Sequence, residues 1–117
     1  SYPMSEEDMN LISLVTMAEA EGESELGKRL VIDTILNRID HPNWPNSGRE
    51  VIYQKSQFTS VWNGRIERCY VRDDILNLVK EELKSRTNTS CLFFRTEKYS
   101  SYGTPLLKEG NHYFSSY

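Results

Sequence analysis

The chain has 117 residues, the size of one compact domain, so residues 1–117 are expected to form a single folded unit. Its net charge of −3 provides no basic surface, so nucleic acid is not predicted as a partner. No apolar run approaches the ~20 residues that a bilayer span requires, so no membrane span is predicted.

Two helices are predicted in the first third of the chain. Ser5 and Asp8 have the spacing of a capping box, and apolar residues then recur at helical spacing, so a first helix should cover residues 5–20. Ser24 can cap a second helix, which carries a broad apolar face and should end before Pro42.

The middle of the chain is predicted to be mostly loop. Residues 40–48 contain two prolines, two asparagines and a glycine, which is typical of a surface loop. Residues 49–54 are expected to add a short helical turn. Residues 55–68 show no sustained period but are too apolar for a freely solvated loop, so they are expected to line a site.

The last third predicts one more helix and a small β-element. A helix is expected over residues 73–86, with apolar residues on one face and acidic residues at its start. Residues 91–95 and 112–115 are aromatic-rich and bounded by turn residues, which predicts two strands joined across a loop. The predicted fold class is therefore α+β, mainly α, with about three main helices and a short antiparallel β-element near the C-terminus.

Glu19 is the first candidate for catalysis. It follows Ile12 by seven residues and Val15 by four, so at ~100° per residue it points within about 20° and 40° of those apolar side chains. A carboxyl group removed from water keeps its proton to higher pH and can give that proton to a glycosidic oxygen. Periodicity alone also allows a structural role, in which a neighbouring amide binds a polar residue at a helix end.

A second carboxylate lies close by in the sequence. Glu23 and Glu25 flank Ser24 at the start of the second helix, where the helix dipole favours negative charge, so helix capping is their expected role. Glu23 is also within a few residues of Glu19, and a second carboxylate could position a water molecule or stabilise positive charge on a sugar.

Five sequence blocks resemble those of the SleB-type spore cortex-lytic and cell-wall hydrolase family. Residues 18–23, Ala-Glu-Ala-Glu-Gly-Glu, resemble the family motif A-E-A-x-G-E. The resemblance extends from about Met9 to Phe114, and the blocks occur in the family's order. The later blocks are Ile35-Leu36-Asn37-Arg38, Val51-Ile52-Tyr53, Gln57-Phe58-Thr59 with Trp62, and Gly110-Asn111-His112-Tyr113-Phe114.

The resemblance implies a small lysozyme-like domain that acts on the bacterial cell wall or spore cortex, with Glu19 as the catalytic acid. Its expected target is the β-1,4 bond between N-acetylmuramic acid, or its lactam, and N-acetylglucosamine in peptidoglycan. The resemblance also implies the reaction of a lytic transglycosylase, in which one acid protonates the leaving oxygen and then, as a base, helps the 6-hydroxyl close an anhydro ring. The alternatives are a hydrolytic muramidase that uses Glu23 as a second carboxylate, and a glycan-binding domain that does not cut. No cofactor is expected.

The same blocks supply candidate substrate-binding residues. Gln57 and Thr59 can hydrogen-bond sugar hydroxyls or acetamido groups. The aromatic rings of Tyr53, Phe58 and Trp62 can stack on pyranose faces. Each of these side chains is equally plausible as part of the core.

Two more candidates come from the last block, and two positions depart from the family pattern. Asn111 and His112 could orient Glu19 or close the floor of a cleft, although a lone histidine near a strand is more often structural. Thr59 stands where serine is more usual, and Arg95 follows the aromatic strand. No export signal or wall-binding module is visible, which suits a phage lysin, a coat-assembled spore enzyme or a domain of a longer chain.

Metal and thiol chemistry are weaker alternatives. His41 and His112 are the two histidines, and no HExxH motif is present, so a zinc amidase or peptidase site is not predicted. Cys69 and Cys91 lack CxxC spacing and are predicted to be two free thiols rather than one disulfide. A cysteine peptidase that pairs one of them with His112 stays a rival hypothesis.

Overall fold

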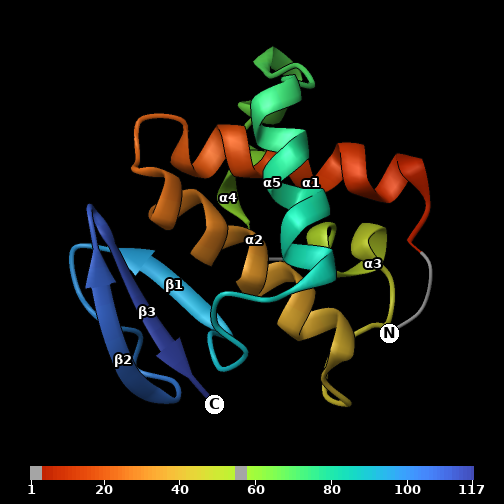
Figure 1. Cartoon of the computed structure of the whole chain (residues 1–117). Coiled ribbons are helices and arrows are strands. Elements are labelled where there is room, and N and C mark those ends of the chain that lie inside the picture. The colour runs from red at the N-terminus through yellow and green to blue at the C-terminus, as the bar shows by residue number, and fades with distance from the viewer. Residues whose placement is uncertain (1–3, 55–57) are drawn as a thin grey trace.

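Three long helices form the larger part of the molecule (Figure 1). The computed structural model describes residues 4–54 and 58–117. α1 covers Glu6–Ala20, α2 covers Glu25–Asp40 and α5 covers Asp73–Lys84, and each of the three packs against the other two. The predicted helices are therefore confirmed, with ends within two residues of those observed. None of the described helices is both long enough and apolar enough to cross a bilayer.

The predicted signals at the helix starts act as caps. Ser5 Oγ accepts a hydrogen bond from the backbone N–H of Asp8 at 3.1 Å, and Ser24 Oγ accepts one from Gly27 at 3.0 Å. The Asp8 carboxylate accepts a further hydrogen bond from the backbone N–H of Gly48 at 3.2 Å. Asp8 thereby joins α1 to α3 (Gly48–Ile52), the short helical turn expected after the loop.

The hydrophobic core lies where α1, α2, α3 and α5 meet. α2 is buried at every position from 30 to 39, because other elements surround it, and this explains its broad apolar face. The segment after α3 continues through α4 (Thr59–Trp62) and a 3₁₀ turn, Ile66–Arg68. The main core cluster consists of Ile12, Val15, Ile32, Ile35, Leu36, Ile39, Val51, Ile52, Phe58, Leu78 and Val79.

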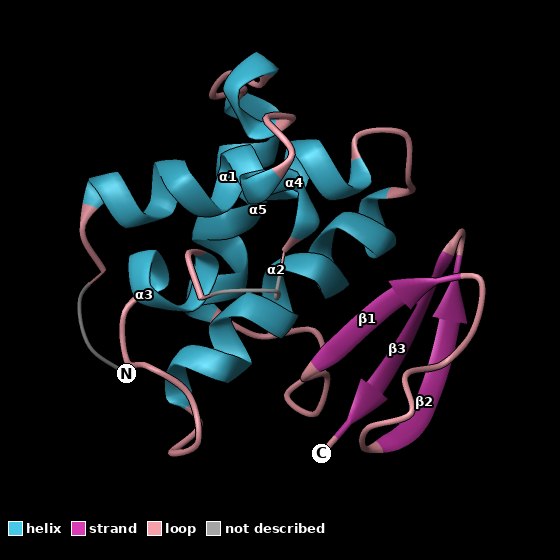
Figure 2. Cartoon of the chain, turned by 180° about the vertical axis from the view of Figure 1, so that it is seen from behind, coloured by secondary structure: helices cyan, strands magenta, loops and turns pink. Residues whose placement is uncertain are grey.

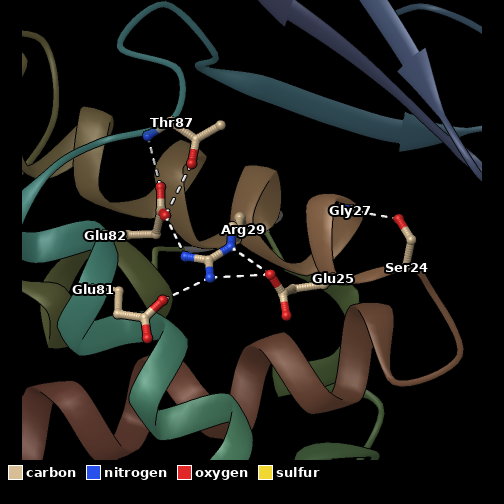
Figure 3. Close-up of polar contacts among 7 residues, drawn as sticks. All are labelled: Ser24, Glu25, Gly27, Arg29, Glu81, Glu82 and Thr87. Atoms are coloured by element: carbon tan, nitrogen blue, oxygen red, sulfur yellow. Dashed lines mark hydrogen bonds and ion pairs between the residues drawn. The ribbon is translucent and has the colours of Figure 1, made fainter.

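An ion-pair network joins α2 to α5 (Figure 3). Arg29 Nη1 donates to Glu82 Oε2 at 2.8 Å, and Arg29 Nη2 donates to Glu81 at 2.6 Å and to Glu25 at 3.1 Å. The Glu82 side chain is 2% exposed and also accepts hydrogen bonds from the backbone N–H and the hydroxyl of Thr87, at 2.7 and 2.9 Å. These partners replace the hydrogen bonds to water that the Glu82 carboxylate loses on burial.

A second buried acid lies against Glu82. Burial, together with a hydrogen bond to Glu82, raises the pKa of Asp33 to about 8. Burial also opposes the charged form of Glu82, but hydrogen bonds from Asp33, Thr87 and Arg29 outweigh that effect and lower the pKa of Glu82. The two carboxyl groups therefore share one proton, with the charge on Glu82.

A three-stranded antiparallel sheet lies beside the helices (Figure 2). β1 (Phe93–Thr96), β2 (Thr104–Glu109) and β3 (His112–Ser116) are arranged in the order β1-β3-β2. The predicted α+β, mainly α class is confirmed, but β2 lies in the stretch expected to be a loop. β2 is an edge strand with most side chains exposed, so it shows no buried alternation, and its Pro105 is tolerated at an edge.

The sheet is held to the helices by a second apolar cluster near the end of α1. Phe114 of β3 packs with Ala20 of α1, with Leu30 and Val31 of α2, and with Cys91. This contact places the β2–β3 turn and the start of β3 close to the C-terminal end of α1, where Glu19 lies.

Candidate active site

Glu19 lies in the last turn of α1 and lines two adjoining depressions between that helix end and the sheet. Their volumes are about 490 and 360 Å³. Glu19, Thr96 and His112 line both depressions, which therefore form one continuous groove, called the Glu19 groove below. Its other lining residues are Glu23, Thr59, Phe94, Arg95, Glu97, Lys108, Asn111 and Tyr113.

The Glu19 side chain is half-buried in this groove. Within residues 4–54 and 58–117, no group donates a hydrogen bond to its carboxylate or forms an ion pair with it. The structural role that periodicity left open required a neighbouring amide as a partner, and the described residues supply none. The carboxylate oxygens are therefore available to a molecule bound in the groove.

Glu23 has the opposite environment. The backbone N–H of Asn111 donates to Glu23 Oε1 and the Asn111 side-chain Nδ2 donates to Oε2, both at 2.9 Å. The backbone hydrogen bond from Asn111 is the main reason why the pKa of Glu23 is lowered, so this carboxylate stays ionised. Its expected role in helix capping is wrong, because Ser24 caps α2 and Glu23 instead holds the β2–β3 turn.

That turn is shaped to receive Glu23. Gly110 has a φ of +58°, in the left-handed region that favours glycine. A Cβ atom at Gly110 would collide with the Glu23 carboxylate. The absence of a side chain at this position therefore lets Glu23 approach the turn closely.

His112 forms a buried wall of the groove. Its ring packs edge-on against Phe94 and Phe114, with centroids 5.1 and 6.0 Å away. Burial lowers the pKa of His112, although the Glu23 and Glu19 carboxylates act in the opposite direction. Its Nδ1 is buried without a hydrogen-bond partner among the described residues. His112 is therefore neutral near pH 7, with one ring nitrogen left for a ligand or a water molecule.

Comparison with known proteins assigns the family. The sequence profile of the family described as Cell Wall Hydrolase matches residues 22–115. The chain belongs to this family. Glu23, Thr59 and His112 lie within the part of the chain that the family profile matches. Glu19 lies three residues before the start of that part.

Spore cortex-lytic enzymes are among the curated relatives of this chain. A segment of 62 residues is 36% identical to the spore cortex-lytic enzyme of Halalkalibacterium halodurans and 37% identical to that of Bacillus subtilis. The matched segment makes up 53% of this chain but only 19% and 20% of those two enzymes.

Two solved structures share the fold over nearly the whole chain. The catalytic domain of the Bacillus cereus SleB protein has a TM-score of 0.86 at 23% identity, covering 99% of this chain and 94% of that domain. The catalytic domain of the germination-specific lytic transglycosylase SleB from Bacillus anthracis has a TM-score of 0.82 at 23% identity, with 99% of both chains covered. The predicted resemblance to the SleB-type family is thus confirmed.

The candidate substrate-binding residues of the chain lie in different environments. Thr59 lines the Glu19 groove. Phe58 is 1% exposed and packs in the core against Phe94, where it cannot stack on a sugar. Tyr53 and Trp62 are 40% and 58% exposed, so neither is a core residue. Neither side chain lines the Glu19 groove. Gln57 lies outside the described residues.

Apart from Asn111 and His112, the groove residues that lie on or next to the strands were not predicted from the sequence. Thr96 and His112 are register partners on β1 and β3, and Lys108 lies opposite Tyr113 with its Nζ 5.4 Å from that ring. Glu97 adds a third carboxylate to the groove and has a φ of +76°, which is uncommon for a residue other than glycine. Lys108 lies on β2, whose mostly exposed side chains provide no alternation by which the strand could be recognised from the sequence.

The two alternative chemistries find no organised site in the described parts of the chain. Residues 4–54 and 58–117 contain no group of three or more His, Cys, Asp or Glu side chains that could hold a metal ion. Cys69 and Cys91 are free thiols, as predicted. Burial raises the pKa of the Cys91 thiol to about 12, so Cys91 is a poor candidate for a nucleophile.

Proposed function

We propose that this cell wall hydrolase cleaves the glycan strands of peptidoglycan, with Glu19 as the catalytic acid. The observation that carries the proposal is the Glu19 carboxylate itself, which is half-buried in the groove and has no hydrogen-bond or ion-pair partner among the described residues. Family membership and the relationship to spore cortex-lytic enzymes support peptidoglycan as the substrate. The proposed target is the bond between N-acetylmuramic acid, or its lactam, and N-acetylglucosamine.

The proposed reaction is that of a lytic transglycosylase. Glu19 donates its proton to the glycosidic oxygen as the bond from that oxygen to the muramic C1 breaks. The Glu19 carboxylate then accepts the proton of the muramic 6-hydroxyl, whose oxygen forms a new bond to C1. Because that hydroxyl belongs to the same sugar ring, its attack gains from a large effective molarity.

Glu23 has an electrostatic role in this scheme. Asn111 binds both of its oxygens and keeps the carboxylate charged, so Glu23 is poorly placed to take a proton from water. Its fixed negative charge lines the same groove and stabilises the positive charge that develops on the sugar ring. Thr59 also lines the groove, and its hydroxyl can hydrogen-bond the substrate.

A hydrolytic muramidase is the second candidate, because Glu97 provides a further carboxylate on the groove. If Glu97 activates a water molecule, the product carries a free reducing end instead of an anhydro ring. Mass spectrometry of the fragments released from purified sacculi distinguishes the two, since an anhydro end is lighter by one water molecule. Mostly reducing ends would refute the transglycosylase reaction and retain the muramidase. No release of soluble fragments would favour the glycan-binding alternative.

A further inference from the structure

A second cavity adjoins the Glu19 groove and is not used by the reaction proposed above. It has a volume of about 640 Å³, in the range of small-ligand sites. Phe94 and Arg95 line both this cavity and the Glu19 groove, so the two are neighbours along β1. The cavity is called the aromatic pocket below. Besides Phe94, its lining includes four more aromatic rings and two arginines, namely Trp44, Phe93, Tyr102, Tyr117, Arg38 and Arg95.

The rings of the aromatic pocket form a connected wall. The Trp44 ring lies 5.7 Å from Phe93 and 6.1 Å from Tyr117, and the Phe93 ring lies 6.3 Å from Tyr102. Tyr117 accepts a hydrogen bond from Asn43 Nδ2 at 3.0 Å, which orients its ring. Tyr102 and Tyr117 are nonetheless largely exposed. Exposed rings gathered around a cavity offer a surface for aliphatic groups of a ligand.

The two charged side chains that line the aromatic pocket are both arginines. Arg38 is 4% exposed, donates from Nε to the carbonyl oxygen of Leu92 at 2.7 Å, and has its guanidinium 5.6 Å from the rings of both Trp44 and Phe93. Arg95 is exposed and forms no ion pair with any residue in the described part of the chain. None of the described residues that line the pocket is acidic. A carboxylate is the ligand group that this arrangement favours.

Strand geometry directs Arg95 toward the aromatic pocket. Phe93 and Arg95 are two residues apart on β1, so their side chains lie on the same face of the sheet. Phe93 already packs against Trp44 and Tyr102 in the pocket wall. Arg95 therefore lies between that wall and the groove that contains Glu19.

We propose that the aromatic pocket binds the stem peptide of the muramic residue, with Arg95 holding a free carboxylate of that peptide. This inference rests on the proposed function, because it assumes a glycan strand in the Glu19 groove. In the proposed complex, the lactyl branch of the muramic residue at the cleaved bond extends along β1 into the aromatic pocket, which shares Phe94 and Arg95 with the groove. Methyl groups and aliphatic chains of the stem pack against the rings, and Arg95 pairs with the carboxylate.

The proposal makes the chain selective for muramic residues that carry a stem. A muramic lactam has no stem peptide and no free carboxylate, so it leaves the aromatic pocket empty and Arg95 without an anion. A glycan from which the stem has been removed by an amidase retains only the short lactyl carboxylate. Comparing these substrates separates a pocket for the stem from a site for the lactyl group.

The test is the ratio of kcat/KM on stem-bearing strands to kcat/KM on the same strands after amidase treatment. Arg95→Gln is expected to lower this ratio about tenfold, which corresponds to about 1.4 kcal/mol. Tyr102→Ala, which alters only the aromatic pocket, is expected to lower the ratio as well. Arg95→Lys is expected to restore part of the ratio, because it keeps the charge but not the bidentate geometry. Lys98→Gln removes an exposed charge that lines neither cavity and is expected to leave the ratio unchanged.

Each other outcome has a distinct meaning. An unchanged ratio in both Arg95→Gln and Tyr102→Ala, with wild-type cleavage intact, overturns the stem-peptide site and leaves the proposed function standing. If Arg95→Gln lowers kcat/KM equally on both substrates and Tyr102→Ala has no effect, Arg95 binds the lactyl carboxylate. This result also overturns the stem-peptide site. No cleavage of either substrate by the wild-type chain overturns the proposed function, and the inference with it.

Discussion

Two pairs of acidic residues in this molecule have opposite surroundings. Glu19 and Glu23 line a groove at the end of α1, whereas Asp33 and Glu82 are buried between α2 and α5. Glu82 is surrounded by donors, and Asp33 keeps the proton that prevents two adjacent buried charges. In the groove, Glu23 has two donors from Asn111, and Glu19 has none among the described residues.

The comparison indicates how the same functional group serves two purposes. A carboxylate whose donors are all supplied by the protein is fixed in position and contributes to the fold. A carboxylate left without donors at a groove can exchange a proton with a bound molecule. Glu23 lies between these cases, because it is fixed by the protein and yet lines the groove.

The largest expected effect is that of Glu19→Gln. The amide keeps the shape of the side chain but cannot donate a proton, so cleavage of sacculi should fall about 10³-fold or more. Glu21→Gln is the matched control, because Glu21 is one position past α1, is exposed and does not line the groove. Full activity of a folded Glu19→Gln protein would show that Glu19 is not the catalytic acid.

Glu82→Ala tests the buried pair. It removes the acceptor of the Thr87 N–H and the buried partner of Arg29, so the free energy of unfolding should fall by about 3 kcal/mol. Glu81→Ala also removes an ion pair with Arg29, but Glu81 is exposed, so a loss of less than about 1 kcal/mol is expected. Urea denaturation measures both. Equal losses would mean that burial does not distinguish these two acids.

Glu23→Gln is expected to have an intermediate effect. The amide can still accept one hydrogen bond from Asn111 but loses the fixed charge, so kcat should fall by about ten- to a hundredfold, or about 1.4 to 2.7 kcal/mol. Asn111→Ala should act through the same contact, so the double variant should lose less than the sum of the two single losses. Additive losses would indicate that Glu23 acts independently of Asn111. A loss as large as that of Glu19→Gln would indicate a two-carboxylate mechanism.

Asp33→Asn has the smallest expected effect and tests which acid of the buried pair holds the proton. The folded-state pKa of about 8 lies above the unfolded value of about 3.9, so the folded chain holds a proton that the unfolded chain has released. The free energy of unfolding therefore falls as the pH rises between these two pKa values, by about 1 kcal/mol between pH 7 and 8.

In Asp33→Asn this decline should be absent, because asparagine has no proton to lose and can still accept the hydrogen bond from the backbone N–H of Asn88. Urea denaturation at pH 7 and pH 8 measures it. His112, whose pKa is lowered by burial, titrates below this range. If the free energy of unfolding declines equally in the variant and in the wild type, the proton is held by a group other than Asp33.

The sequence by itself determined the helices and the position of Glu19. Ser5 and Ser24 cap helices through residues three positions away, and the apolar period of α1 and α2 reflects neighbours within one or two turns. These signals are local, so they remain visible in the order of residues along the chain. The block Ala18-Glu19-Ala20 and the order of the later blocks then identified the family.

Tertiary structure decided which side chains share the site. Glu23 binds Asn111 across 88 positions, a pairing for which nothing in the local sequence of either residue provides a signal. Phe58 and Trp62 have similar apolar character and are four residues apart, but one is in the core and the other is exposed. Arg95 lies beside Trp44 and Tyr102 only because β1 is placed next to the end of α2. Contacts between distant segments depend on how whole elements pack, and therefore only the folded chain reveals them.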